Sequence, residues 1–416
     1  MIEDILTEIG IKARKASKKL ATISTVIKND AIKFVADQID KKRGDILNTN
    51  EIDVNMAISK KLSNPMIDRL MIDDKRITDM INNLLLISEL DDPLGKVMEI
   101  IERPSGLKIK KVRTPIGVIG IIFESRPNVF LDAGSLCLKS GNASILRCGS
   151  ESFETTNMLK KCFDLGLEKS NMDKNVVQLI PTKDRKAVET LIGLHEFVDV
   201  IVPRGGKSLV NLIQKKAKIP VFAHLEGIVH IYIDEYADLE IARKVIINSK
   251  MRRPGICGAV ECLLINKKFF ECHNAPFLID LISLGVEVRV SKELSSIPGT
   301  ISAKIDDWGK EYLDTIISAK IVKNIDEAIN HISNYGSGHT DCIITENKNM
   351  SEKFFNELDS SILMKNSSTQ FADGGEFGFG AEIGISTGKI HARGPIGCEQ
   401  LTTFKYIVES KGSIRD

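Results

Sequence analysis

The sequence predicts an α/β fold in which a cofactor-binding domain of Rossmann type is followed by a second α/β domain. Between residues 117 and 202, short apolar runs alternate with helical patterns, and repeated strand–helix units are typical of a parallel, doubly wound sheet. After Pro220 the same alternation starts again, which indicates the second domain. The chain of 416 residues is also too long for one ordinary hydrophobic core.

The composition is that of a globular protein. The 57 basic and 56 acidic residues nearly balance, so the charge indicates no basic face and no nucleic-acid partner. No apolar run approaches the roughly 18 residues that a membrane span requires. The eight cysteines include no Cys-x-x-Cys pair and no signal peptide is visible, so we expect reduced thiols in a cytoplasmic protein.

The first hundred residues are predicted to be helical. Apolar residues recur at three- and four-residue spacing from Ile5 to about Ile101, and such a leader would cover a sheet. The segment 107–113 then alternates apolar and charged residues, which predicts a strand with one face in water. An exposed strand of this kind can add to the sheet of another subunit.

Strands and helices alternate along the rest of the chain. The first half is predicted to contain buried strands at 117–123, 143–146, 176–180 and 198–202, with helices at 131–139, 151–167 and 185–194 and another after Arg204. The second half is predicted to contain strands at 229–233, 260–265, 286–290, 316–322 and 341–344, and a last strand at 401–408.

A cysteine on a predicted turn is the candidate nucleophile. A Pro-Gly dipeptide ends the helix that runs from Leu239 to about Lys250, so Cys257 lies between that helix and the next buried strand. Lys250, Arg252 and Arg253 precede this cysteine, and nearby cations favour the nucleophilic thiolate. The alternative is a small buried side chain, which is what most free cysteines are.

Two turns in the first half could bind an anion. Gly205 and Gly206 follow a strand and precede a helix, whose first N–H groups suit a phosphate; the alternative is a plain turn. A phosphate-wrapping loop of the ATPase kind is not expected, because its first glycine would have to stand where the chain has Ile201. Arg126 and Asn128 follow the first buried strand at its carboxyl end, where open α/β sheets place ligands. A solvent-exposed turn is the alternative there.

A metal site is not expected. The seven histidines include no His-x-x-x-His and no His-Glu-x-x-His arrangement, which are the spacings that place two imidazoles on one helix face.

Several stretches resemble the gamma-glutamyl phosphate reductases, also called glutamate-5-semialdehyde dehydrogenases, of the aldehyde dehydrogenase superfamily. The similarity covers most of the chain from about Pro115 onward. It is carried by Arg253-Pro-Gly-Ile-Cys-Gly-Ala-Val-Glu261 and by the segments 117–128, 138–147, 202–206, 377–384, 391–397 and 401–406.

The resemblance implies an architecture. Residues 1–224 would form an NADPH-binding domain, 225–385 a catalytic domain that carries Cys257, and 386–416 a return to the cofactor domain. The hairpin 97–112 and the C-terminal strand would form a small oligomerisation element, so a homo-oligomer is expected.

The resemblance also implies roles for single residues. In the cofactor site, the 2′-phosphate of NADPH would be bound by Arg147 with Ser150 and Glu151. The pyrophosphate would lie against Gly205 and Gly206, and the nicotinamide ribose would be bound by Glu311. In the reaction site, the resemblance makes Cys257 the nucleophile, and either Asn128 or Arg126 would hold the oxyanion. The guanidinium groups of Arg126, Arg252 and Arg253 are in addition suitable donors for the substrate phosphate.

The activity implied by the resemblance is the reduction of L-glutamyl 5-phosphate to L-glutamate 5-semialdehyde through a Cys257 thioester, the second step of proline biosynthesis. Glutamate 5-kinase would be the enzyme that supplies the substrate. One departure is Gly258, where the family usually has Asn, so the oxyanion would depend on backbone N–H groups or on Asn128. Two alternatives stay open: a hydrolytic dehydrogenase with Glu226 or Glu261 as general base, and a catalytically inactive scaffold.

Overall fold

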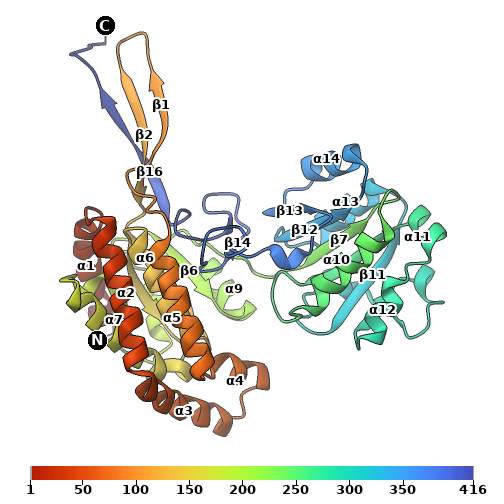
Figure 1. Ribbon diagram of the computed structural model, residues 1–416, viewed down its shortest axis with the longest axis horizontal. Coiled ribbons are helices and arrows are strands. Elements are labelled where there is room, and N and C mark those ends of the chain that lie inside the picture. Colours follow the sequence, from red (N-terminus) through yellow and green to blue (C-terminus); the bar gives the residue numbers. More distant parts are fainter. Residues whose placement is uncertain (1, 416) are drawn as a thin grey trace. The chain divides into compact units, whose positions relative to one another are not determined.

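The computed structural model describes residues 2–415 and divides the chain into two compact units (Figure 1). The first unit contains the described residues up to Ala223, together with 378–384 and those from Pro395 onward. The second unit contains 224–377 and 385–394. The boundary after residue 223 lies next to the one that the sequence predicts after 224, whereas the return to the first unit occurs in two passages.

Helices form the beginning of the first unit. Five helices precede the first strand: α1 (Ile2–Leu20), α2 (Thr25–Lys41), α3 (Arg43–Ser59), α4 (Asn64–Leu70) and α5 (Asp74–Glu89). Ser24 and Asp73 cap α2 and α5 by accepting N–H bonds from Ile27 and Arg76. The predicted helical leader is confirmed up to Glu89. Beyond that residue the prediction is wrong, because Val97–Glu102 pairs with the next strand as β1.

A four-stranded parallel sheet lies in the first unit. Its strands are β3 (Val118–Phe123), β4 (Ala143–Arg147), β5 (Val177–Leu179) and β6 (Val200–Arg204), in the order β5-β4-β3-β6. The connecting helices are α6 (Asn128–Lys139), α7 (Phe153–Lys169), α8 (Lys186–Leu191) and α9 (Lys207–Lys216), with 3₁₀ turns at Ser150–Ser152 and Lys174–Val176. The order reverses between β3 and β6, and such a switch point is where doubly wound sheets bind ligands at their carboxyl ends.

One ionic contact fixes the helical leader to this sheet. Arg14 of α1 donates two hydrogen bonds to the Asp199 carboxylate, at 2.7 and 3.0 Å, and the same carboxylate accepts the Val118 N–H at 2.7 Å. Gly117 has a φ of 136°, and a Cβ there would lie 2.3 Å from Asp199 Oδ2. Only glycine therefore lets β3 begin this close to the carboxylate.

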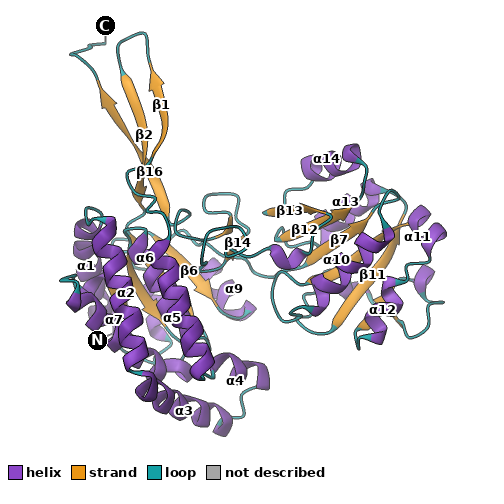
Figure 2. Ribbon diagram, in the orientation of Figure 1, coloured by secondary structure: helices purple, strands orange, loops and turns teal. Residues whose placement is uncertain are grey.

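A three-stranded antiparallel sheet extends from the first unit (Figure 2). Its strands are β1, β2 (Lys108–Pro115) and β16 (Thr402–Glu409), in the order β1-β2-β16. The strands predicted at 107–113 and 401–408 are confirmed. Val97, Ile100, Tyr406 and Val408 are each about half exposed on this sheet.

The second unit is built on a seven-stranded parallel sheet (Figure 1). Its order is β10-β9-β11-β8-β7-β12-β13, with bounds β7 (Val229–Ile233), β8 (Val260–Asn266), β9 (Glu287–Val290), β10 (Ile301–Ser302), β11 (Ile316–Val322), β12 (Thr340–Ile344) and β13 (Ile362–Lys365). The five predicted strands of this half are confirmed, whereas the short β10 and the edge strand β13 were not predicted.

Helices and short strands complete the second half of the chain. The helices are α10 (Leu239–Met251), α11 (Lys267–His273), α12 (Phe277–Ser283), α13 (Ile325–Tyr335) and α14 (Lys348–Glu357). The 3₁₀ turns are Lys292–Leu294, Ile305–Asp307 and Thr369–Phe371, and β14 (Ile385–Ser386) pairs with β15 (Gly394–Pro395). The two faces of the large sheet bury separate apolar clusters, one around Ile231 and Leu263 and the other around Leu264 and Ile343.

Substitution of Gly166 by alanine should destabilise the first unit. A Cβ at this position in α7 would lie 2.7 Å from the backbone nitrogen of Val35 in α2. Because backbone cannot move aside as a flexible side chain can, we expect the overpacking cost of about 1–3 kcal/mol. The measurement is a lower midpoint of thermal unfolding for Gly166→Ala.

Gly44→Ala is the matched control, because Gly44 lies in α3 with nothing within 4 Å of the methyl group that alanine would add. Alanine is a better helix former than glycine by about 1 kcal/mol, so this variant should unfold at the same temperature or higher. Equal midpoints for the two variants would contradict close α2–α7 packing at Gly166.

Candidate active site

Cys257 lies on the turn between α10 and β8, as predicted. Its side chain is half-buried, whereas Cys272 is exposed and the other six cysteines are buried. Burial raises the pKa of the Cys148 thiol to about 11, and that of Cys342 to about 12. Cys148 and Cys342 therefore stay protonated, and exposure leaves Cys257 and Cys272 as the accessible thiols.

A buried ion pair closes the turn that carries Cys257. Lys250, in the last turn of α10, donates from Nζ to Glu261 Oε2 of β8 at 2.6 Å, and the two side chains are 0% and 1% exposed. The other Glu261 oxygen accepts the N–H of Leu313. Burial raises the pKa of Glu261 to about 7 and lowers that of Lys250, while their mutual attraction opposes both shifts. The helix end and the strand start are thus joined across the turn.

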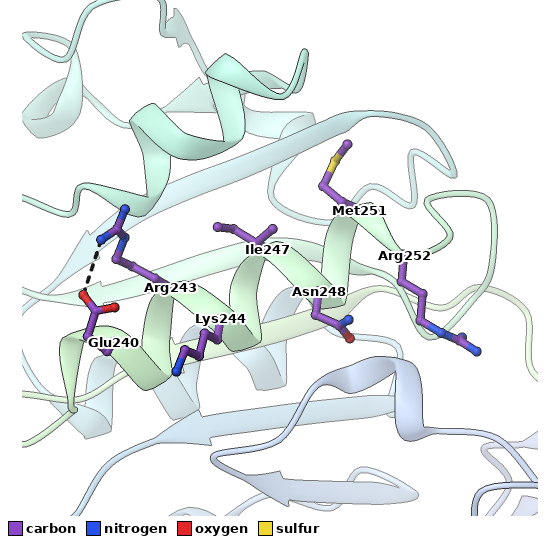
Figure 3. Close-up of a pocket in the computed structure, with 7 residues that line it drawn as sticks. All are labelled: Glu240, Arg243, Lys244, Ile247, Asn248, Met251 and Arg252. Atoms are coloured by element: carbon purple, nitrogen blue, oxygen red, sulfur yellow. Dashed lines mark hydrogen bonds and ion pairs between the residues drawn. The ribbon is translucent and has the colours of Figure 1, made fainter.

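The predicted role of Lys250 is therefore corrected. Lys250 was predicted to be one of the cations beside the thiol, but its ammonium group pairs with Glu261. Arg252 and Arg253 are both exposed just before Cys257. Figure 3 shows Arg252 at one end of a surface hollow along α10, whose other lining residues are Glu240, Arg243, Lys244, Ile247, Asn248 and Met251.

Gly227 lies against the backbone of Cys257. A Cβ at position 227 would meet the Cys257 carbonyl oxygen at 2.3 Å and its Cβ at 2.8 Å. The Gly227 N–H donates to Glu311 Oε1 at 2.9 Å, which holds the glycine in place. Glu311 was predicted only as a ligand of the nicotinamide ribose. Gly227 was not predicted at all, because the contact joins loops that are far apart in the chain.

Two histidines that sequence analysis did not assign lie beside Cys257. One coordinating atom from each of His224, Cys257 and His339 lies within 4.8 Å of those of the other two. The centroids of the two imidazole rings are 5.0 Å apart, and the rings meet edge to face. His224 precedes β7, Cys257 precedes β8 and His339 precedes β12, so the amino ends of three neighbouring parallel strands bring them together.

Gly258, the departure from the family pattern, is buried against the segment 369–372. A Cβ at this position would lie 3.1 Å from the carbonyl oxygen of Thr369 and 3.7 Å from the Ala372 Cβ. Any larger residue here would require that segment to shift by a few tenths of an ångström. Gly258 therefore lacks the side chain that the family has here, and its backbone packs closely next to Cys257.

In the first unit, the predicted anion-binding turn already binds a carboxylate. Gly206, the N-cap of α9, donates its N–H to Glu124 Oε2 at 3.0 Å, and a Cβ on Gly205 would lie 2.5 Å from the same oxygen. Glu124 follows β3 and the glycines follow β6, so this contact spans the switch point of the sheet. The amide of Gly206 thus accommodates an anionic oxygen at the place predicted for a phosphate.

Arg147, the first of the predicted 2′-phosphate residues, ends β4, and Ser150 and Glu151 belong to the 3₁₀ turn Ser150–Ser152. Arg147 is 6% exposed; its Nη2 donates to the Lys183 carbonyl at 3.3 Å, while its buried Nε has no hydrogen-bond partner among the described residues. Glu151 accepts the N–H and the hydroxyl of Ser125 at 2.7 and 2.8 Å. Ser150 is exposed and directs its hydroxyl toward Glu151 at 3.5 Å.

The two predicted ligands after β3 differ in their surroundings. Arg126 is half-buried on the turn between β3 and α6. Asn128, the first residue of α6, donates from Nδ2 to Asp132 at 3.0 Å, and burial raises the pKa of that carboxyl. Part of the hydrogen-bonding capacity of Asn128 is therefore committed within its own helix.

A doubly wound parallel sheet with a switch point, followed by a second α/β unit, defines a two-unit α/β protein of the dinucleotide-binding type. The model of the aldehyde dehydrogenase family matches residues 8–285, and members of this family use a nicotinamide cofactor. The chain belongs to the aldehyde dehydrogenase family, and within it to the gamma-glutamyl phosphate reductases.

The relatives agree in sequence and in fold. The chain is 49% identical to gamma-glutamyl phosphate reductase of Rhizobium johnstonii, over 100% of this chain and 97% of the relative. The crystal structure of the Thermotoga maritima reductase matches with a TM-score of 0.96 and 42% identity, over 99% and 100% of the two chains. A glyceraldehyde-3-phosphate dehydrogenase from Methanocaldococcus jannaschii, complexed with NADP, shares the fold with a TM-score of 0.68 and 18% identity, over 98% and 95%.

None of the helices within residues 2–415 is long and apolar enough to cross a bilayer.

Breaking the buried ion pair on one side should strongly destabilise the second unit. In Lys250→Met the Glu261 carboxyl loses its cation but stays buried, and such a loss costs about 3–5 kcal/mol. The double variant Lys250→Met/Glu261→Leu removes both charges and should recover most of that stability. The measurement is the thermal unfolding midpoint of the three proteins.

Lys268→Met is the control, because Lys268 pairs with Glu235 at 2.7 Å while 69% exposed. An exposed pair contributes at most about 1 kcal/mol, so this variant should unfold close to the parent. A Lys250→Met variant as stable as Lys268→Met would show that the pair does not hold the turn.

Proposed function

We propose that the chain reduces L-glutamyl 5-phosphate to L-glutamate 5-semialdehyde with NADPH and releases phosphate, as the second step of proline biosynthesis. The observation that carries the proposal is the half-buried Cys257, held on its turn by the Lys250–Glu261 pair and by Gly227. The full-length similarity to gamma-glutamyl phosphate reductases supports the choice of substrate.

Cys257 acts as the nucleophile. Its thiolate sulfur attacks the acyl carbon of the substrate, the carbon–oxygen bond to phosphate breaks, and phosphate leaves with the bonding electrons. The product is a thioester on Cys257, which divides one difficult step into two easier ones. NADPH, when bound, supplies the hydride that reduces the thioester, after which the sulfur is released from the carbonyl carbon as the aldehyde forms.

The oxyanion of each tetrahedral intermediate needs donors in fixed positions. With Gly258 in place of the family's usual Asn, backbone N–H groups and Asn128 are the candidates. Arg126, Arg252 and Arg253 would bind the substrate phosphate, since guanidinium groups suit phosphate oxygens in pairs. The exposure of Arg252 and Arg253 immediately before Cys257 supports this role.

The residues of the first unit fit a phosphorylated dinucleotide. The carboxylate on the Gly206 amide is an anion that a pyrophosphate oxygen would replace, with Gly205 leaving room for it. The unpartnered Nε of Arg147 is a buried donor, and with Ser150 and Glu151 it would hold the 2′-phosphate of NADPH. From the second unit, Glu311 would bind the nicotinamide ribose.

We further propose that the enzyme is a cytoplasmic homo-oligomer. All eight cysteines are free, which agrees with a reducing compartment. The half-exposed apolar side chains on β1 and β16 suit a strand or sheet of a second copy. Supply of the acyl phosphate by glutamate 5-kinase stays a prediction.

A hydrolytic aldehyde dehydrogenase is the second candidate, and it needs a carboxylate that deprotonates water. Glu261 does not suit this role, because its two oxygens bind Lys250 and the Leu313 N–H. Glu226, which precedes Gly227, is the candidate base that stays.

Oxidation of glutamate 5-semialdehyde with NADP should depend on added inorganic phosphate. In this reverse direction phosphate, and not water, must attack the Cys257 thioester, and arsenate should replace it. Glu226→Gln should change the rate little, because no base is needed to activate water. The measurement is NADPH formation followed by absorbance.

The control variants are Cys257→Ala and Cys272→Ser. Cys257→Ala, which removes the nucleophile, should leave less than about one part in a thousand of the rate. Cys272→Ser should keep the parent's rate, because the exposed Cys272 lies outside the proposed site. Full turnover without phosphate that is lost in Glu226→Gln would establish the hydrolytic dehydrogenase instead. No turnover by the folded parent under any of these conditions would favour an inactive scaffold.

Arg147→Ala should weaken the use of NADPH much more than that of NADH. A charge-assisted hydrogen bond to the 2′-phosphate contributes about 1.5–3 kcal/mol, so the KM for NADPH should rise about ten- to a hundredfold. The measurement is the ratio of kcat/KM for the two cofactors.

Arg103→Ala removes an arginine that is exposed between β1 and β2, and it should leave this ratio unchanged. An equal loss for NADPH and NADH in Arg147→Ala would assign Arg147 to the fold or to another part of the nucleotide.

A further inference from the structure

We propose that His224, Cys257 and His339 form a reversible Zn²⁺ site, and that occupation of this site blocks the nucleophile. Coordination itself follows from the geometry of the three side chains. The inhibition, by contrast, rests on the proposed function, because it requires Cys257 to be the reacting group.

The three side chains offer the ligands that zinc prefers. Zinc takes thiolate sulfur at about 2.3 Å and imidazole nitrogen at about 2.0–2.1 Å, so ligand atoms around a tetrahedral ion lie roughly 3.3–3.6 Å apart. In this chain one atom of each residue lies within 4.8 Å of the others. Closing the remaining gaps requires shifts of about an ångström, which side-chain rotation supplies.

Each imidazole is oriented by a polar contact at its Nδ1 atom. His224 Nδ1 lies 2.7 Å from the carbonyl oxygen of Ile385 and donates to it, so Nε2 is the ring nitrogen that remains for an ion. His339 Nδ1 lies 2.9 Å from the Thr340 hydroxyl. Metal-binding histidines use their other ring nitrogen in this way, which fixes the ring and the tautomer.

The site is accessible to an ion and, among the residues that the structure describes, has three protein ligands. His224 and Cys257 are half-buried, whereas His339 is fully buried. A fourth position stays open for water, as in zinc sites that exchange their ligands. Binding replaces the thiol proton by the zinc–sulfur bond and releases that proton to solvent, so affinity rises with pH. A sulfur bound to zinc no longer attacks the acyl carbon.

No metal site was predicted from the sequence, because these three ligands lack the helical spacing of a His-x-x-x-His pair. Here the ligands come from the loops before β7, β8 and β12, which a parallel sheet places at one edge. The pattern is therefore visible only in the fold.

A second group of similar chemistry must be separated from this one. His230, Cys262 and His331 also bring three coordinating atoms within 4.8 Å of one another, but all three are buried. His230 there contacts Asp341 at 3.1 Å, and Cys262 lies 3.8 Å from His331 Nε2. All three residues of this second group are buried, whereas His224 and Cys257 are only half-buried, so we assign the exchangeable ion to the site with Cys257.

The experiment titrates the full-length protein with Co²⁺ and Zn²⁺. Cobalt bound to a thiolate gives a charge-transfer band in the near ultraviolet, and this band should form with one equivalent and disappear when Zn²⁺ is added. Zn²⁺ should abolish reductase turnover, and a chelator should restore it. In His224→Gln the affinity for Co²⁺ should fall by more than the roughly 100-fold known for losing an outer-shell partner.

His339→Gln provides a second test at a buried position, with thermal unfolding as the check that the variant is folded. Cys272→Ser and His273→Gln change exposed residues outside the cluster, and both should bind Co²⁺ like the parent. The proposal is overturned if the band survives in His224→Gln and Cys257→Ser, or if it is lost only in Cys262→Ser. A normal cobalt spectrum with no reductase turnover would overturn the proposed function but not the metal site.

Discussion

The parallel pairing of β12, β7, β8 and β11 decides where the chemistry of the second unit lies. Because these strands run in one direction, the loops before them meet at the amino edge of the sheet. Those loops carry His339, His224 with Gly227, Cys257, and Glu311, in the order of the strands. In the first unit the candidate groups follow β3, β4 and β6 and lie at the carboxyl edge, as is usual for doubly wound sheets.

The position of Cys257, the proposed nucleophile, depends on two contacts that give little stability by themselves. A buried ion pair such as Lys250–Glu261 gains in attraction roughly what it loses in desolvation. Glycine at position 227 loses more backbone entropy on folding than another residue would. It lets the Cys257 backbone approach more closely than any Cβ would allow. Both contacts fix the position of the turn between α10 and β8, and neither does so by packing apolar side chains.

Much of the fold was predictable because its signals are local. The bounds of β7 and β11 follow from apolar runs, and Cys257 was located by the Pro-Gly break before it. The signals that were missed are long-range. Lys250 is engaged by a residue of the next strand, and His224 and His339 join the site only through strand order. The apolar spacing of residues 97–102 continues the helical pattern before it. This segment forms the strand β1 because it pairs with β2, and its own spacing does not indicate this.

The pairing of β2 with β16 has a consequence for how the protein is made. Residues 108–115 bond to residues 402–409, so β2 leaves the ribosome long before its partner is synthesised. During that interval one edge of the hairpin offers free N–H and C=O groups, and neighbouring nascent chains carry the same edge. The charged residues of β2, Lys108, Lys110, Lys111 and Arg113, repel identical strands during this delay and so reduce the risk of premature association.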